Sequence, residues 1–208
     1  PAQQVSEENR KGLIEAAGPP PAPPLHVGRA DFELTHEQRA AIAAVHAVLG
    51  RFECLLLDGV TGSGKTEIYL QVIESVLARG DQVLVLIPEI ALTPQTFARF
   101  SDRFGRAEVY HSGLTERERA QAWQACRGGD AHVLIGTRSA IFVPFARLGL
   151  IVVDEEHDGS FKQQDGFRYS ARDLAVKRAQ LLGIPLLMGT ATPALETLHN
   201  ARRGRYRH

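Results

Sequence analysis

Residues 54–66 read Cys54-Leu55-Leu56-Leu57-Asp58-Gly59-Val60-Thr61-Gly62-Ser63-Gly64-Lys65-Thr66. The first four residues form a short apolar run typical of a buried strand, and Asp58-Gly59 ends it. The next eight fit the pattern G-x-x-x-x-G-K-[ST]. Apolar residues then recur at helical spacing from Ile68 to Leu77, and Gly80 closes the segment. A buried strand, a glycine-rich turn and an amphipathic helix in this order predict a phosphate-binding loop.

The same alternation of strand and helix continues outward from this loop. Short apolar runs at 83–87, 132–135, 150–153 and 185–188 predict further buried strands. Thr93-Pro94 predicts the start of one helix, and Thr115 with Glu118 offers a capping box for another that ends at 128–129. Residues 171–182 predict a helix between the last two strands. Continuous apolar strands favour a mostly parallel sheet with helices on both faces, so the predicted fold class is α/β.

A proline-rich stretch at 19–24 divides the chain. It holds five of the eleven prolines, and such a run favours an extended, semi-rigid spacer. We therefore expect residues 1–24 to be the end of a preceding domain plus a linker, and residues 25–208 to be the nucleotide-binding lobe, as part of a longer protein. The alternative is that the prolines are a ligand for a proline-reading domain.

Composition limits the function classes. The 24 basic side chains balance the 24 acidic ones, so any nucleic-acid contact must come from a local surface. The sequence has no run of 18 apolar residues, which predicts no membrane partner and a cytoplasmic location. Cys54 and Cys126 lie far apart in apolar segments and are predicted to be reduced thiols of the core.

The glycine-rich turn predicts how a nucleotide is held. Backbone N–H groups converge on phosphate oxygens at a helix N-terminus, where the helix dipole adds positive charge. Lys65 is expected to reach the β- and γ-phosphates of ATP, and the Thr66 hydroxyl to hold Mg²⁺. The alternative is a glycine-rich turn that matches by accident. The predicted nucleotide-binding residues are Gln38, Gly59, Thr61, Gly62, Ser63, Gly64, Lys65, Thr66 and Glu67.

The strand at 150–153 runs into Asp154-Glu155-Glu156-His157. Open α/β sheets bind ligands at the carboxyl ends of their strands. Asp154 is therefore predicted to orient Mg²⁺ through water, and Glu155 to polarise the attacking water. The alternative for both is a solvated acidic turn. His157 is expected to bond toward the γ-phosphate or to a coupling motif, and a structural role is its alternative.

An Asp-Glu-x-His strand end after such a loop resembles the helicases of superfamily two. Gly189-Thr190-Ala191-Thr192-Pro193 looks like their motif that ties hydrolysis to strand handling, and Leu34-Thr35 with Gln38 resembles their adenine-reading glutamine motif. Residues 87–93 and 136–140, the latter with Arg138, look like their DNA-facing motifs. Residues 161–173 are similar to the aromatic-rich loop of the PriA family of replication-restart helicases, and residues 192–198 also resemble that family.

This resemblance covers residues 34 to 208 and implies a RecA-like first motor lobe. It implies ATP and Mg²⁺ as cofactors, 3′-to-5′ unwinding, and single-stranded and forked DNA as partners. It also implies primosome and single-strand-binding proteins as partners and a nucleoid-associated, cytoplasmic location. The family's zinc cysteines are absent here. The second lobe, which carries a charge-stabilising arginine, is absent as well, so this fragment is expected to hydrolyse ATP weakly.

The aromatic-rich segment can also be interpreted from its residues. Bases stack on aromatic rings, and arginine and lysine bind phosphates. Gly159 and Gly166 favour a mobile loop that shifts Glu155 when DNA binds. Core packing is the alternative for Phe161 and Tyr169, a helix-surface position for Gln38, and a surface salt bridge for Arg138. The predicted coupling and DNA-contacting residues are His157, Phe161, Lys162, Phe167, Arg168, Tyr169, Arg138, Thr190 and Thr192.

Three other functions compete with this prediction. Another fork-remodelling or repair helicase of the superfamily would share every motif except the segment at 161–173. A P-loop kinase or GTPase switch would need a lid or an N-K-x-D signature, and the sequence contains no such signature. A scaffold that uses nucleotide only for stability would have no need of Glu155.

Overall fold

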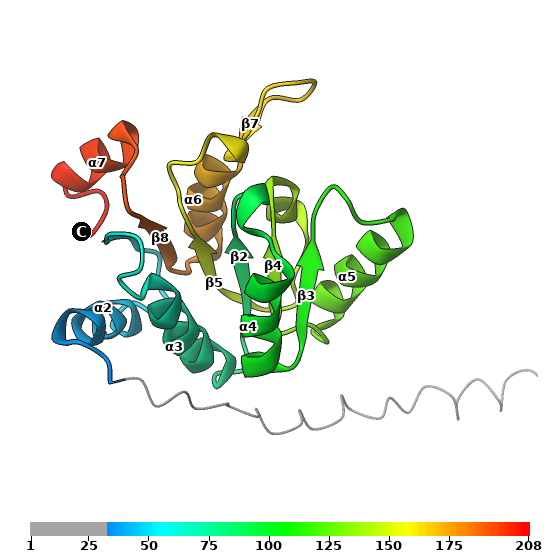
Figure 1. The fold of residues 1–208 in the computed structure, drawn as a ribbon, viewed down its shortest axis with the longest axis horizontal. Coiled ribbons are helices and arrows are strands. Elements are labelled where there is room, and N and C mark those ends of the chain that lie inside the picture. The colour runs from blue at the N-terminus through cyan, green and yellow to red at the C-terminus, as the bar shows by residue number, and fades with distance from the viewer. Residues whose placement is uncertain (1–32) are drawn as a thin grey trace, which may run out of the picture.

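The computed structural model describes residues 33–208, so the predicted linker and preceding segment at 1–24 lie outside the described residues. A six-stranded sheet runs through the fold in the order β1-β8-β5-β2-β4-β3 (Figure 1). All five strand pairings are parallel. The strands are β1 (Cys54–Asp58), β2 (Gln82–Leu86), β3 (Ala107–Tyr110), β4 (Val133–Gly136), β5 (Leu148–Val153) and β8 (Leu186–Thr190). The predicted α/β class with a parallel sheet is confirmed.

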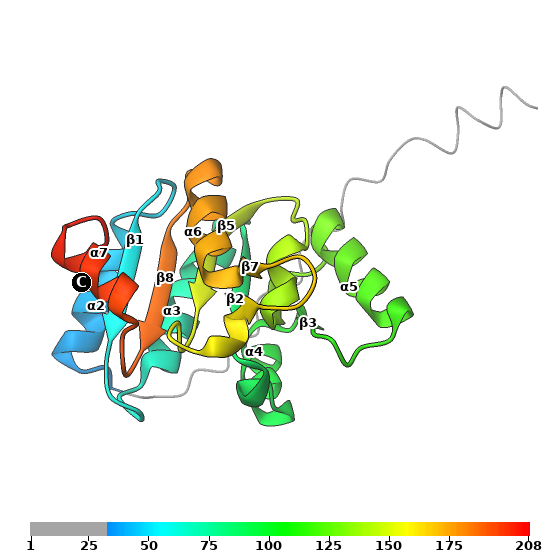
Figure 2. The same ribbon diagram turned by 90° about the horizontal axis from the view of Figure 1, so that it is seen from above.

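Helices cover both faces of this sheet (Figure 2). One core cluster packs α2, α3 and α4 against the strand side chains of one face, such as Val83 and Val85. The other packs α5 and α6 against those of the opposite face, such as Leu84 and Leu86. Because both faces of the central strands are buried, β2, β4, β5 and β8 consist mainly of apolar residues. The helices are α2 (His36–His46), α3 (Lys65–Leu77), α4 (Pro94–Phe104), α5 (Glu116–Gly128), α6 (Ala171–Leu182) and α7 (Leu195–Arg202).

Local capping signals determine where several helices begin. Thr93 accepts from the backbone N–H of Thr96, and Pro94 occupies the first helical position of α4. Thr115 and Glu118 form the complete capping box of α5, as predicted. A further capping box, between Thr35 and Gln38, begins α2. Each cap satisfies backbone donors that the first helical turn leaves free.

Two pairing elements carried no apolar run and were missed from the sequence. The strand β3 lies at the edge of the sheet, and all four of its residues are half-buried. The short strands β6 (Lys162–Gln163) and β7 (Tyr169–Ser170) pair antiparallel and make the aromatic-rich segment a hairpin. This hairpin projects from the rest of the fold at the top of the view (Figure 1). The predicted mobile loop is therefore built on a paired base.

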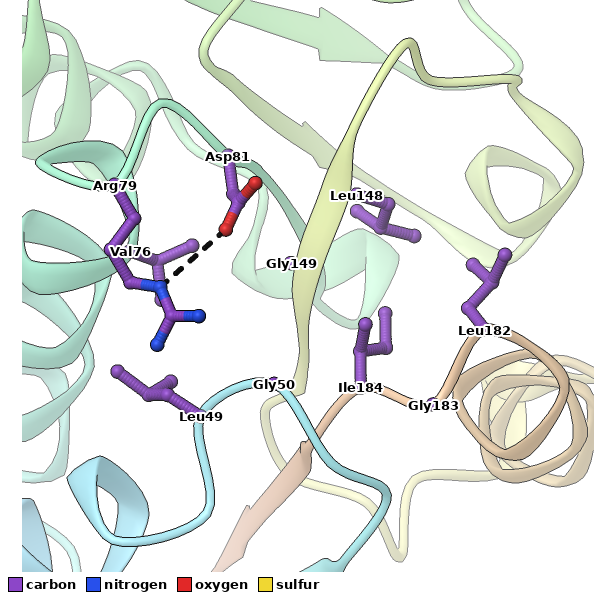
Figure 3. A pocket seen from close by; sticks show the side chains of 10 residues that line it. All are labelled: Leu49, Gly50, Val76, Arg79, Asp81, Leu148, Gly149, Leu182, Gly183 and Ile184. Atoms are coloured by element: carbon purple, nitrogen blue, oxygen red, sulfur yellow. Dashed lines mark ion pairs between the residues drawn. The ribbon is translucent and has the colours of Figure 1, made fainter.

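The amino-terminal ends of the strands enclose a cavity of about 170 Å³ (Figure 3). Two of its lining residues, Asp81 and Arg79, pair at 3.7 Å, and Asp81 also pairs with Arg147 at 2.9 Å. A Cβ on Gly149 would lie 2.6 Å from the Cβ of Asp81, so the turn before β2 approaches β5 too closely for a side chain. The phosphate loop lies at the other, carboxyl edge of the sheet.

Within residues 33–208, no helix combines the length and the apolar character that crossing a membrane requires.

Candidate nucleotide-binding site

The glycine-rich turn connects β1 to α3. Gly62 and Gly64 both have φ of 83°, a left-handed conformation that glycine adopts without steric cost. Gly64 directly precedes α3, which begins at Lys65. The backbone N–H of Gly59 donates to the carbonyl of Thr190 at 3.0 Å, which fixes the start of the turn to the end of β8. The predicted strand, turn and helix are all present.

Lys65 lies beneath this turn. Its side chain is mostly buried, and its Nζ donates to the carbonyl of Gly59 at 2.6 Å and to that of Val60 at 3.4 Å. The same Nζ lies 4.0 Å from a carboxylate oxygen of Glu155. The only lysine of the turn is thus held between its backbone and the acidic strand end, where it can neutralise phosphate charge.

Asp154 follows β5 and contacts α3. Its Oδ1 accepts from the hydroxyl of Tyr69 at 2.9 Å and from the backbone N–H of Glu155 at 3.1 Å. Burial raises the pKa of Asp154, and the bond from Tyr69 opposes that rise. Burial also raises the pKa of Tyr69, and the nearby charge of Asp154 adds to the effect. The phenol is therefore the donor and the carboxylate the acceptor.

Glu155 has φ of 47° and is the only non-glycine residue with positive φ in residues 33–208. Residues other than glycine rarely adopt this backbone conformation, and it persists where the surrounding structure enforces it. The turn is held by the N–H of Glu156, which donates to Gly189 at 3.1 Å, and by that of Asp158, which donates to Glu155 at 2.8 Å. In this turn the Glu155 carboxylate lies 4.0 Å from the Nζ of Lys65.

His157 contacts the predicted coupling motif. Its Nδ1 lies 2.7 Å from the hydroxyl of Thr190 and 3.6 Å from a carboxylate oxygen of Glu155. The same hydroxyl accepts from the backbone N–H of Thr192 at 3.1 Å. Of the two partners expected for His157, the structure provides the one in the motif at 189–193.

Gln38 uses both ends of its amide within the protein. Its Oε1 accepts from the N–H of Thr35 at 2.9 Å, and its Nε2 donates to the carbonyl of Ser63 at 2.9 Å. An amide carries a second N–H and a further lone pair, so it can still read a base. Gln38 thus completes the capping box of α2 and contacts the phosphate loop, and adenine reading stays a prediction.

These elements surround one cleft of about 980 Å³. Its backbone N–H groups, its cation and its oxygen ligands are the set that a nucleotide phosphate and Mg²⁺ require. The carboxylate of Glu67, however, pairs with Arg103 at 3.5 Å and accepts from Gln71 at 2.8 Å. Its partners in the structure are therefore side chains of α4 and α3. The lining residues include Thr35, Gln38, Thr61, Gly62, Ser63, Gly64, Lys65, Thr66, Glu67, Asp154 and Glu155.

Glu156 is a structural residue that the sequence did not reveal. It is 1% exposed, and its carboxylate accepts from Arg172 at 3.2 Å, from the N–H of Ala194 at 2.7 Å and from the hydroxyl of Thr197 at 2.7 Å. Its carboxylate contacts α6 and the start of α7, whereas that of Glu155 lies 4.0 Å from Lys65. Glu156 joins the strand end to α6 and to the start of α7.

The hairpin divides the predicted DNA-contacting aromatics. Phe161 is 1% exposed and belongs to the core, so its predicted stacking role is corrected to packing. Phe167 is 78% exposed at the tip, and Lys162 and Arg168 are also exposed. Tyr169 is half-buried and packs edge-on against Phe142 with ring centroids 5.0 Å apart. The exposed surface is made by Phe167, Arg168 and Lys162, with Tyr169 at its base.

Arg138 makes two backbone contacts that the sequence did not predict, and its predicted contact with DNA phosphate stays a prediction. Its guanidinium donates to the carbonyl of Ser160 at 3.3 Å and to that of Lys162 at 3.0 Å. In residues 33–208 it has no carboxylate partner within ion-pair distance, so the expected surface salt bridge is corrected. Arg138 holds the base of the hairpin against the segment that follows β4.

Comparison with known proteins places this geometry in a family. The DEAD/DEAH box helicase family matches residues 35–201. "Replication restart protein PriA" of Haemophilus influenzae is 53% identical over 181 residues, which cover 86% of this chain and 25% of that protein. The Bacillus subtilis protein of the same name is 49% identical over 176 residues, covering 83% and 22%. The chain thus spans about a quarter of the length of these relatives.

Solved structures share the fold. RecG bound to a three-way DNA junction matches with a TM-score of 0.59 and 24% identity, over 84% of this chain and 23% of that one. The DUF1998 helicase MrfA bound to DNA and AMPPNP matches with a TM-score of 0.60 and 20% identity, over 86% and 27%. The family match, together with the RecA-like sheet and its phosphate loop, shows that the chain belongs to the DEAD/DEAH box helicases and is a lobe of the PriA type.

Proposed function

We propose that this chain is the ATP-binding first lobe of a 3′-to-5′ DNA helicase that acts in replication restart and primosome assembly. It binds ATP or ADP with Mg²⁺ and hydrolyses ATP only weakly without a second lobe. The observation that carries the proposal is the single cleft that brings together Lys65 and Thr66, at the start of α3, with Asp154 and Glu155, which follow β5. The names of the relatives support replication restart as the setting.

The proposed chemistry follows from the positions of these side chains. Mg²⁺ supplies charge neutralisation at the phosphates when it is bound, with Thr66 and Asp154 to hold it. Lys65 binds the phosphate oxygens, and the helix N-terminus after Gly64 adds partial positive charge. Glu155, aimed at the cleft by its strained backbone, orients water and accepts its proton.

The proposed link to DNA runs through one contact of the acidic turn and through the short chain segment that joins this turn to the hairpin. His157 bonds to Thr190 of the coupling motif, and the hairpin begins a few residues after His157. Single-stranded DNA that stacks on Phe167 and pairs with Arg168 would favour one hairpin position over another, which needs only differential affinity. Forked DNA, primosome proteins and single-strand-binding proteins are the partners that we propose for the whole protein, located with the nucleoid in the cytoplasm.

The test of the nucleotide site is Lys65→Ala, with binding of Mg-ADP to this chain measured by calorimetry. The wild-type chain should bind with a Kd on the order of micromolar. Charge-assisted hydrogen bonds are worth about 1.5–3 kcal/mol, so the variant should bind about 10- to 100-fold more weakly. Lys177→Ala, which removes an exposed lysine of α6, is the matched control and should change nothing. Unchanged affinity in Lys65→Ala would remove the assignment of the phosphate loop.

A further inference from the structure

Tyr69 occupies an unusual position next to the acidic turn. It lies on α3, four residues after Lys65 and three after Thr66, so it shares their side of the helix one turn further on. Its side chain is 1% exposed, and the hydroxyl has Asp154 as its hydrogen-bond partner at 2.9 Å. A buried phenol normally needs such a partner, but this partner is also the predicted acid of the Mg²⁺ site.

Gly189 makes the space for this hydroxyl. A Cβ built on Gly189 would lie 1.5 Å from the Tyr69 hydroxyl oxygen and 2.7 Å from the ring carbon that bears it. No side chain at position 189 is compatible with the phenol in this place. The start of the coupling motif and the phosphate-loop helix therefore meet at the Tyr69 hydroxyl, which donates to Asp154.

The two oxygens of Asp154 are used differently. Oδ1 accepts both from Tyr69 and from the backbone N–H of Glu155. These two donors fix the rotation of the carboxylate, because they lie on different elements and both point at the same oxygen. Oδ2 is then the oxygen left to face the cleft that Asp154 lines. Partners that orient a ligand in this way strongly affect metal affinity.

We propose that Tyr69 is a positioning residue for the Mg²⁺ site, which holds the Asp154 carboxylate so that one oxygen faces the metal. This inference rests on the proposed nucleotide site. It assigns to Tyr69 an effect on the Mg²⁺ requirement of nucleotide binding rather than on nucleotide binding itself.

The experiment compares wild type with Tyr69→Phe, which keeps the ring and removes the hydroxyl. ADP binding to this chain is measured by calorimetry without Mg²⁺ and across a Mg²⁺ titration. The Mg²⁺ concentration at half-maximal effect should rise about 10-fold, while the affinity without Mg²⁺ stays within about twofold. Tyr110→Phe, on the edge strand β3 at the far side of the sheet from β1, is the matched control and should behave as wild type.

A double-mutant cycle identifies the route of the effect. If Tyr69 acts through Asp154, adding Tyr69→Phe to Asp154→Asn should shift the Mg²⁺ requirement by less than about twofold, because coupled residues are not additive. If Tyr69→Phe raised the Mg²⁺ requirement of the Asp154→Asn variant by the full 10-fold or so, Tyr69 would not act through Asp154. Gly189→Ala offers a second variant, since its methyl group would occupy the place of the same hydroxyl and should produce the same Mg²⁺-specific defect.

The outcomes separate this inference from the proposed function. Failure of the wild-type chain to bind ADP with Mg²⁺ would contradict both. Normal wild-type binding with an unchanged Mg²⁺ requirement in Tyr69→Phe would contradict the positioning role alone. An equal loss of affinity with and without Mg²⁺, accompanied by a lower melting temperature, would show that Tyr69 only packs.

Discussion

At the scale of single residues, the acidic turn after β5 sends its carboxylates to different sides. Glu155 faces Lys65 and the nucleotide cleft, whereas Glu156 is buried and faces Arg172 and Thr197. The left-handed backbone at Glu155 contributes to this division. A buried carboxylate that accepts three hydrogen bonds is costly to disturb, because its donors would be left without partners.

Arg172 forms one buried and one exposed ion pair, so the contributions of the two pairs to stability can be compared. It lies 3.2 Å from Glu156, whose side chain is 0% exposed, and 3.2 Å from Asp173, whose side chain is 66% exposed. We expect Glu156→Gln to lower the free energy of unfolding by about 2–4 kcal/mol, since it breaks a buried pair. Asp173→Asn should lower it by less than about 1 kcal/mol, because exposed pairs are screened. Urea unfolding of both variants measures the difference. Equal losses of unfolding free energy would contradict the role of Glu156 in joining the strand end to α6 and α7.

At the scale of elements, the hairpin β6–β7 is attached firmly at its base and exposed at its tip. Arg138 donates to two carbonyls at its start, and Phe161 anchors it in the core. Tyr169 packs on Phe142, whose neighbours Ile141 and Val143 both accept from Arg178. The base is therefore tied to α6 and to the segment after β4, and residues 164–168 form the exposed tip.

The exposed tip leads to a prediction for the full-length protein. Phe167→Ala should weaken single-stranded DNA binding by about 5- to 100-fold, because one stacked base is worth about 1–3 kcal/mol. DNA stimulation of the ATPase should fall with it, while ADP affinity and melting temperature stay unchanged. Leu181→Ala, an equally exposed apolar residue on α6, is the control and should retain stimulation. Normal stimulation by DNA in Phe167→Ala would leave the coupling role of the hairpin without support.

At the scale of the whole molecule, two core clusters flank one parallel sheet. Cys54 and Cys126 both belong to the cluster beneath α5 and α6, and both are free thiols. Burial raises the pKa of Cys126 to about 12 and raises that of Cys54 as well. Since the thiolate is the reactive form, neither cysteine should react with a disulfide reagent in the folded chain.

Thiol labelling should therefore report opening of this core. We expect both cysteines to react within minutes in urea and neither to react on that timescale in the native chain. Mg-ADP at about 100 times its Kd should slow native labelling by up to about 100-fold, because ligand binding stabilises only the folded state. Rapid labelling of one cysteine in the native chain would show that the cluster opens locally.

The sequence by itself determined the features that depend on neighbouring residues. The phosphate loop, the alternation of strand and helix, and the caps at Thr93 and Thr115 are local signals, because backbone geometry and hydrogen bonding act over a few residues. Each strand with both faces buried showed itself as a continuous apolar run. The acidic turn was recognisable because it follows such a run.

Only the tertiary structure decided which side chains meet. Tyr69 and Asp154 are 85 positions apart, and Glu156 and Thr197 are 41 apart. Each of these residue types can pair with many partners, so its spacing along the chain does not predict the contact. Phe161 and Phe167 lie in one segment, yet packing buries the first and exposes the second. The half-buried edge strand β3 likewise carries no pattern of its own, because its pairing with β4 depends on the assembled sheet.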